Sequence, residues 1–125
     1  MSTVNLAVLD AALAHIEANP EQHEQRWWFS RAQGCGTAMC LAGTIAWQAG
    51  WKPISPEDWS TTTDDYGNPV KICALVAKDG VDRHVGTLAR ELLGLDGDDA
   101  DNLFGAYNTL ADLRRIRDEL AERAL

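Results

Sequence analysis

Cys35 and Cys40 are the residues of this chain whose chemistry is easiest to name, because thiolates bind soft metal ions and take part in redox reactions. Four residues separate them, and a largely apolar segment, residues 38–47, begins between them. Zinc sites usually have tighter paired spacing and a second pair of the same kind. Here the remaining ligands of a tetrahedral site would be scattered: Cys73 and one of His15, His23 or His84. A metal-binding module using Cys35 and Cys40 is therefore an alternative function and not the leading one.

The same two cysteines could instead form a thiol redox sensor. Cys40 is expected near the start of a helix, where the helix dipole favours the reactive thiolate. A reversible disulfide between Cys35 and Cys40 requires their Cα atoms to lie within about 6.8 Å of each other. The apolar sequence around Cys40 predicts burial, which raises the pKa of a thiol. We therefore expect Cys40 to act mainly as a small buried hydrophobic residue.

The acidic run at residues 96–102 is a further candidate, because calcium prefers carboxylate oxygens. Counted from Asp96, however, Ala100 and Asp101 stand where a calcium loop needs an oxygen ligand and a glycine. Capping of a helix that begins at Asp96 explains the run better. The sequence places no nucleophile, base and orienting group together, so we predict a noncatalytic protein without a cofactor. An enzyme whose site cannot be recognised from sequence is the remaining alternative.

All five tryptophans fall between residues 27 and 59. Tryptophan is common both in protein cores and at binding hot spots. We expect Trp47 and one of Trp27 and Trp28 to be buried. The other tryptophans and nearby acidic loops are expected to contact a partner protein. The predicted partner-binding residues are Trp28, Trp51, Trp59, Asp64 and Asp65. The leading prediction is thus a noncatalytic protein-interaction module, and the alternative role of these tryptophans is to cover the edge of the core.

Apolar residues at helical spacing indicate the elements that position these side chains. They predict a helix at residues 4–18, a central helix at 37–49 with Thr37 as N-cap, and later helices at 85–93, from 96, and from 109. The central helix is apolar on almost all sides, which is typical of a helix in the middle of a domain. The predicted core residues are Leu9, Leu13, Leu41, Ile45, Trp47, Leu88, Leu92 and Leu113.

The segments between these helices are expected to be short or irregular. Asn19 and Pro20 predict a second, short helix that runs into residues 26–29, followed by a loop at 30–36. Residues 59–63 and 70–76 predict two strands joined by the turn at 65–69. The predicted fold class is therefore mainly α: one compact helical domain over residues 1–125, with about five or six helices around the central one and a small β-hairpin inserted at 55–77.

The net charge of −8 argues against direct nucleic-acid binding, which depends on Lys and Arg displacing counterions. A protein with a basic surface is the expected partner, although surplus acid also keeps a protein soluble. Residues 38–47 are shorter than the roughly 20 residues that span a bilayer, and residues 1–19 have no basic leader. We therefore expect a cytoplasmic protein without membrane contact. Small-residue helices pack equally well within a chain or across a dimer, so it is expected to be a monomer or a homodimer.

The pattern C-G-T-x-x-C-x-A-G occupies residues 35–43. Asn-Pro-Glu at 19–21 and Trp27 precede it, and Leu-Leu-Gly-Leu at 92–95 and Leu-Phe at 103–104 follow it. With these features most of the chain, except residues 52–80, resembles a group of small uncharacterised bacterial and phage-encoded proteins. That group has no established activity, so the resemblance assigns no catalytic residues. It implies an actinobacterial phage or its host as the source, and a phage accessory protein in the host cytoplasm that acts on a host protein.

Overall fold

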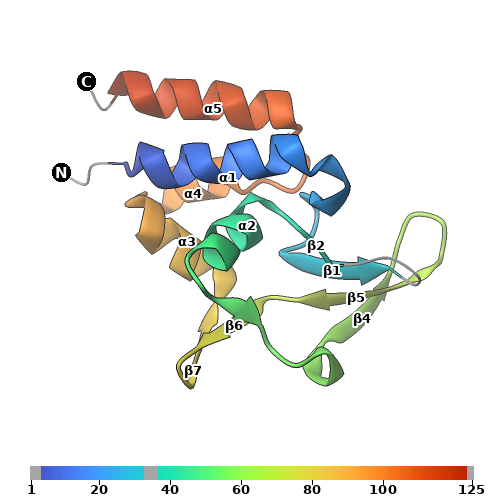
Figure 1. Ribbon diagram of the computed structural model, residues 1–125. Helices are drawn as coiled ribbons and strands as arrows, with labels where there is room; N and C mark the ends of the chain where they lie inside the picture. The colour runs from blue at the N-terminus through green and yellow to red at the C-terminus, as the bar shows by residue number, and fades with distance from the viewer. Residues whose placement is uncertain (1–3, 33–36, 124–125) are drawn as a thin grey trace.

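Helices form one layer of the molecule and two small sheets form the other (Figure 1). The computed structural model describes residues 4–32 and 37–123. The α-helices are α1 (Leu6–Ala18), α2 (Leu41–Gln48), α3 (Val85–Leu93), α4 (Gly97–Leu103) and α5 (Leu110–Arg123). The 3-10 helices are η1 (Pro20–Gln22) and η2 (Pro56–Asp58). The strands are β1 (Phe29–Ala32), β2 (Thr37–Met39), β3 (Lys52–Pro53), β4 (Ser60–Thr63), β5 (Pro69–Cys73), β6 (Leu75–Lys78) and β7 (Val81–His84).

The strands belong to two antiparallel sheets, with the orders β2-β1-β5-β4 and β3-β6-β7. Phe29 of β1 lies opposite Met39 of β2 and Cys73 of β5, which sets the register of the first sheet. The prediction of a mainly α domain is therefore wrong, because helices and sheets share the structure.

The hairpin predicted at residues 55–77 is part of this larger arrangement. β4 pairs with β5 across the expected turn, with Thr63 opposite Pro69. β5 also pairs with β1, so it is an interior strand and not half of an isolated hairpin. The strand predicted at 70–76 breaks at Ala74, whose carbonyl accepts a hydrogen bond of 2.9 Å from the amide of Val85. The break sends β6 into the second sheet.

Residues 20–40 differ most from the predicted helices and loop. Helical geometry after Asn19 ends with η1, and residues 29–32 form β1 instead of a helix end and a loop. Thr37, the predicted N-cap, lies in β2 opposite Arg31. Cys40 caps α2 in its place, and its sulfur accepts a hydrogen bond of 3.5 Å from the amide of Gly43. The backbone amides and carbonyls of β1 are hydrogen-bonded to β5, which lies far along the chain. The sequence around residues 29–32 therefore does not reveal this strand.

Helix α2 joins two hydrophobic cores, and all of its residues from Leu41 to Ala46 are buried. The first core lies among the helices and includes Leu9, Leu13, Leu41, Ile45, Leu93, Leu103, Leu113, Ile116 and Leu120. The second lies between α2 and the sheets and contains Phe29, Met39, Ala46, Trp59, Cys73, Val76, Val85 and Leu88. Two predicted core residues, Trp47 and Leu92, are half-buried and cover the second core.

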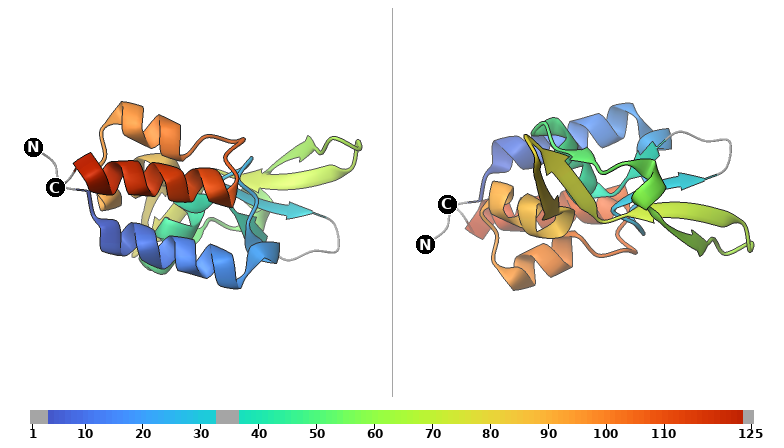
Figure 2. Two further views of the ribbon diagram at one scale, coloured as in Figure 1. Left: turned by 90° about the horizontal axis from the view of Figure 1, so that it is seen from above. Right: turned by 90° about the horizontal axis from the view of Figure 1, so that it is seen from below.

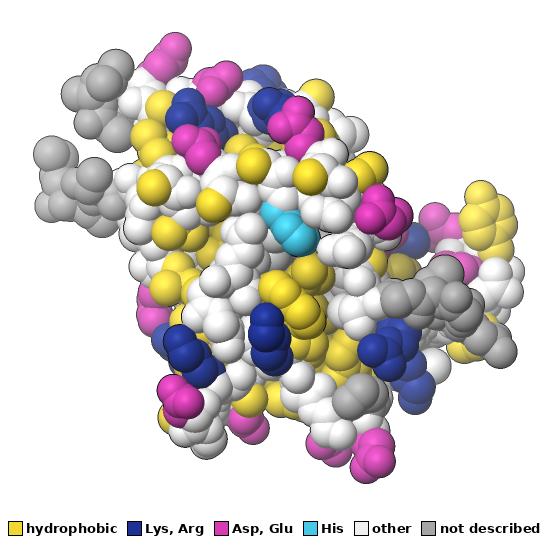
Figure 3. Space-filling model, in the orientation of Figure 1, with side chains coloured by type: hydrophobic (Ala, Val, Ile, Leu, Met, Phe, Trp, Pro, Cys, Tyr) yellow, Lys and Arg dark blue, Asp and Glu magenta, His cyan; other side chains and the backbone are white. Residues whose placement is uncertain are grey.

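Helices α1 and α5 lie side by side and run in opposite directions (Figures 1 and 2). The guanidinium of Arg117 donates hydrogen bonds of 2.7 and 2.9 Å to the carboxylate of Asp10, which lowers the pKa of that carboxyl. Arg114 of α5 also forms an ion pair with Glu17 of α1. Acidic and basic side chains accordingly alternate over these helices, above a face where hydrophobic side chains gather (Figure 3). Within residues 4–32 and 37–123, no helix has the length and apolar character needed to cross a membrane.

Candidate functional site

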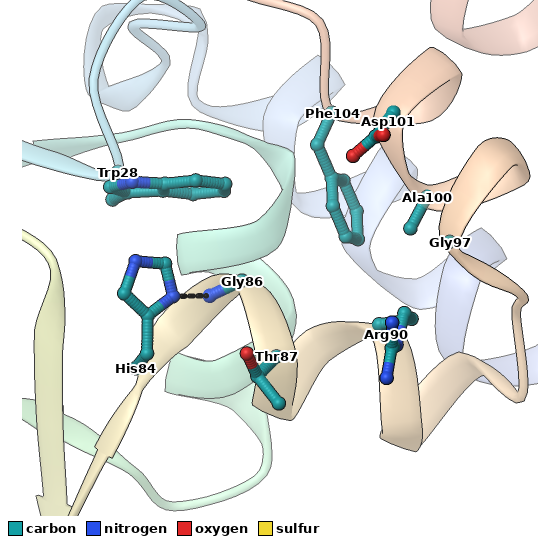
Figure 4. A pocket seen from close by; sticks show the side chains of 9 residues that line it. All are labelled: Trp28, His84, Gly86, Thr87, Arg90, Gly97, Ala100, Asp101 and Phe104. Atoms are coloured by element: carbon teal, nitrogen blue, oxygen red, sulfur yellow. Dashed lines mark hydrogen bonds between the residues drawn. The ribbon is translucent and has the colours of Figure 1, made fainter.

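A cavity of about 390 Å³ lies between α3 and α4 (Figure 4). This volume falls in the range of small-molecule sites. It is lined by Trp28, His84, Gly86, Thr87, Arg90, Gly97, Ala100, Asp101 and Phe104. The side chains combine two aromatic walls with one cation and one anion, which is a chemical character suited to binding.

Helical spacing brings most of these residues to the cavity. On α3, Thr87 and Arg90 are three residues apart and therefore share a face. On α4 and its C-cap, Gly97, Asp101 and Phe104 follow the same periodicity. Arg90 reaches across the cavity, since a Cβ added to Gly97 would lie 3.8 Å from Nη1 of Arg90. The two helices thus present opposite charges to a shared space.

The indole of Trp28 forms the wall at the sheet side of the cavity and is held from several directions. Its ring makes edge-on contacts with His84 and Phe104, at centroid distances of 5.4 and 6.3 Å. The Nδ1 atom of His84 accepts a hydrogen bond of 3.1 Å from the amide of Gly86, which fixes the ring that faces Trp28. A Cβ on Gly86 would lie 2.9 Å from the indole, so glycine allows this close approach.

The carbonyl of Trp28 anchors β1 to the start of α2. It accepts a hydrogen bond of 3.1 Å from the amide of Cys40. It also lies so close to Gly43 that an added Cβ would be 2.4 Å from the oxygen. Trp28 is therefore fixed by its backbone as well as by its ring, and the cavity wall is preorganised.

A second hollow, of about 640 Å³, lies on the first sheet around Trp27. Phe29 enters the second core, and because strand side chains alternate, Ser30 points to the opposite face, where this hollow lies. Arg26 stacks over the Trp27 ring at 4.2 Å and donates a hydrogen bond of 2.9 Å to Asp65. Glu21 and Glu24 line the same hollow. We call this region, with the β4–β5 loop beside it, the acidic face.

The loop between β4 and β5 is held by the carboxylate of Asp64. Its Oδ1 atom accepts hydrogen bonds of 2.9 Å from the amides of Tyr66 and Asn68. The bond from the Asn68 amide is the main reason that the pKa of Asp64 is lowered, and the Tyr66 amide adds to it. The loop also has backbone hydrogen bonds that join residue 64 to residues 67 and 68. Tyr66, which is 90 % exposed, therefore projects from an ordered loop.

The predicted partner-binding residues separate into different environments. Trp59 is 6 % exposed, donates a hydrogen bond of 2.8 Å to the carbonyl of Ile54 and belongs to the second core, which agrees with the alternative role of these tryptophans. Trp51 is half-buried over the second core, and Trp28 lines the cavity. Of the five predicted residues, only Asp64 and Asp65 lie in the same structural feature, which is the β4–β5 loop.

Tyr66, Arg90 and Phe104 were not singled out by sequence reasoning. An aromatic residue inside the turn sequence Asp-Asp-Tyr-Gly-Asn at 64–68 is a usable signal for Tyr66. The spacing of Asp101 and Phe104 could have placed those two on one helical face. Their proximity to Trp28 could not be predicted from the sequence, because it depends on tertiary packing.

Cys40, the other predicted site residue, is 1 % exposed, and burial raises the pKa of its thiol to about 12. Its predicted partner Cys35 lies outside the described residues. Cys73 is also buried and carries a free thiol. The part of the chain that the structure describes contains no group of three or more His, Cys, Asp and Glu residues that could hold a metal ion.

Cys40 is expected to resist alkylation in the folded protein. A thiol with a pKa near 12 is almost wholly protonated at pH 8, and the protonated form is a poor nucleophile. Site-resolved mass spectrometry after iodoacetamide treatment should find Cys40 unmodified under native conditions and fully modified in denaturant. Rapid native modification of Cys40 would contradict its burial.

Comparison with protein-family models found no match to the chain, and neither did comparison with curated proteins or with solved structures. The resemblance to bacterial and phage-encoded proteins therefore stays a prediction.

Proposed function

We propose that this protein is a noncatalytic interaction module that binds another protein through its acidic face, with Tyr66 as the central contact. The observation that carries the proposal is the near-complete exposure of Tyr66 on an ordered loop. Because the loop backbone is already ordered, binding through Tyr66 costs little backbone freedom, and tyrosines are enriched among hot-spot residues.

The charge around Tyr66 indicates the kind of partner. Asp65 is exposed beside it, and Glu21 and Glu24 line the neighbouring hollow. The chain as a whole has a net charge of −8. Complementary charge accelerates association and excludes partners of like charge. The proposed partner is thus a protein with a basic surface that surrounds an apolar pocket for the tyrosine ring.

Tyr66→Ala is expected to weaken partner binding about 30-fold or more, which corresponds to the loss of a hot-spot side chain. Proteins retained from a bacterial lysate on immobilised protein would be identified by mass spectrometry, and the affinity of a purified candidate measured by calorimetry. Binding should weaken as salt rises.

Tyr107→Ala is the matched control, because Tyr107 is 93 % exposed but belongs to the α4–α5 segment and does not line the acidic face. It should leave binding unchanged. Equal retention by the Tyr66 and Tyr107 variants, or binding that is insensitive to salt, would contradict the proposed role of the acidic face.

A further inference from the structure

The cavity between α3 and α4 contains two opposite charges that do not neutralise each other. Arg90 and Asp101 both line it, and neither takes part in an ion pair between the described residues. Their neighbours are paired elsewhere: Glu91 with Arg83 at 2.8 Å, and Asp99 with Arg123 at 2.7 Å. A guanidinium and a carboxylate are thus available to a ligand in the same space.

The space between these charges is aromatic. Trp28 and Phe104 stand nearly perpendicular to each other, with an interplanar angle of 78°. Figure 4 shows both rings facing the cavity, with Thr87 and Arg90 on the opposite side. An aromatic ring can stack on one of these walls and contact the edge of the other, which is the favoured geometry of aromatic groups.

We infer that this cavity binds a small aromatic zwitterion, of the class of the free aromatic amino acids. The ring of the ligand lies against Trp28 and Phe104, its carboxylate accepts hydrogen bonds from Arg90, and its ammonium donates to Asp101. Charge-assisted bonds of both signs distinguish such a molecule from an aromatic acid or an aromatic amine. The cavity volume of about 390 Å³ accommodates one molecule of this size. This site is separate from the acidic face.

The test is a titration of the ¹⁵N-labelled protein with L-tryptophan at millimolar concentration, followed by NMR. Saturable shifts are expected at the amides of Gly86, Thr87, Gly97 and Asp101. Indole-3-propionate, which lacks the ammonium, and tryptamine, which lacks the carboxylate, should each bind at least tenfold more weakly. Similar binding of all three compounds, or no saturable shift with L-tryptophan or L-phenylalanine, would overturn the inference.

Two substitutions separate the roles of the charges. Arg90→Gln should weaken L-tryptophan at least tenfold and leave tryptamine unchanged, whereas Asp101→Asn should weaken L-tryptophan and leave indole-3-propionate unchanged. Both residues are exposed, so the variants are expected to fold. Arg115→Gln, on the exposed side of α5, is the matched control and should not change any affinity.

A third variant tests the location without altering charge. Thr87→Trp places a bulky ring in the cavity from an exposed position and should abolish binding of L-tryptophan. Undiminished binding by this variant would show that the ligand sits elsewhere and would overturn the inference.

Discussion

Gly43→Ala is expected to destabilise the folded protein by about 3 kcal/mol or more, as overpacking against rigid backbone does. The added Cβ would lie 2.4 Å from the carbonyl oxygen of Trp28 and 3.1 Å from the Cβ of Met39. The oxygen cannot retreat easily, because it accepts the hydrogen bond from the amide of Cys40. Strand β1 and helix α2 would have to separate, which would disturb both cores. Urea unfolding followed by circular dichroism measures the change.

Gly97→Ala is the matched control for this prediction. Gly97 also lies in a helix, but the nearest atom to an added Cβ is the mobile Nη1 of Arg90, at 3.8 Å. The change in unfolding free energy should stay within about 0.5 kcal/mol. If Gly43→Ala were equally harmless, the close approach of β1 to α2 would be disproved.

Gln25→Met is expected to cost about 2 to 4 kcal/mol, since it keeps the volume of a buried side chain and removes its hydrogen bonds. The Oε1 atom of Gln25 accepts hydrogen bonds from the amide of Leu41 at 3.1 Å and shares one with His23 at 2.9 Å. Its Nε2 atom donates to the carbonyl of Gly105 at 3.2 Å. The amide of Leu41 belongs to the first turn of α2, where no partner within the helix exists. Methionine would leave this buried amide unsatisfied.

Gln48→Met provides the comparison, because Gln48 is exposed and its one side-chain hydrogen bond goes to the carbonyl of Ala11 at 3.3 Å. Its unfolding free energy should change by less than about 0.5 kcal/mol. Thermal and urea unfolding of the two variants should therefore differ clearly. Equal stability of both would mean that Gln25 does not link α2 to the segment after α4.

Features that depend on neighbouring residues could be predicted from the sequence. Gly94 ends α3 with a positive φ of 72°, and Asp96 caps α4 by accepting from the amide of Asp99. At the start of α5, the backbone amide of Thr109 donates to the side chain of Asp112, and the amide of Asp112 donates to the side chain of Thr109. Each of these signals spans four residues or fewer, and no distant partner is needed to interpret it.

Strand pairing could not be predicted in the same way. Residues 29–32 and 37–39 form short strands without an alternating apolar pattern, and β5 is what holds β1 in the sheet. Thr37 has the chemistry of an N-cap, yet the pairing of β2 with β1 moves the start of the helix to Leu41. The same limit applies to the cavity, because Trp28 meets Phe104 only through the packing of α2, α3 and α4. Long-range contacts therefore account for both the wrong fold class and the missed site.

The side-by-side placement of α1 and α5 has a consequence for the order of events on the ribosome. Asp10 and Arg117 are bound to each other across 107 residues of sequence. Leu9 and Leu13 are packed in a core that α5 helps to enclose. During synthesis, α1 emerges first and has to wait for residues 110–123 before that core can close. Helix α2 can cover part of the apolar face of α1 soon after it is made, but the part that α5 covers stays open until α5 has been synthesised.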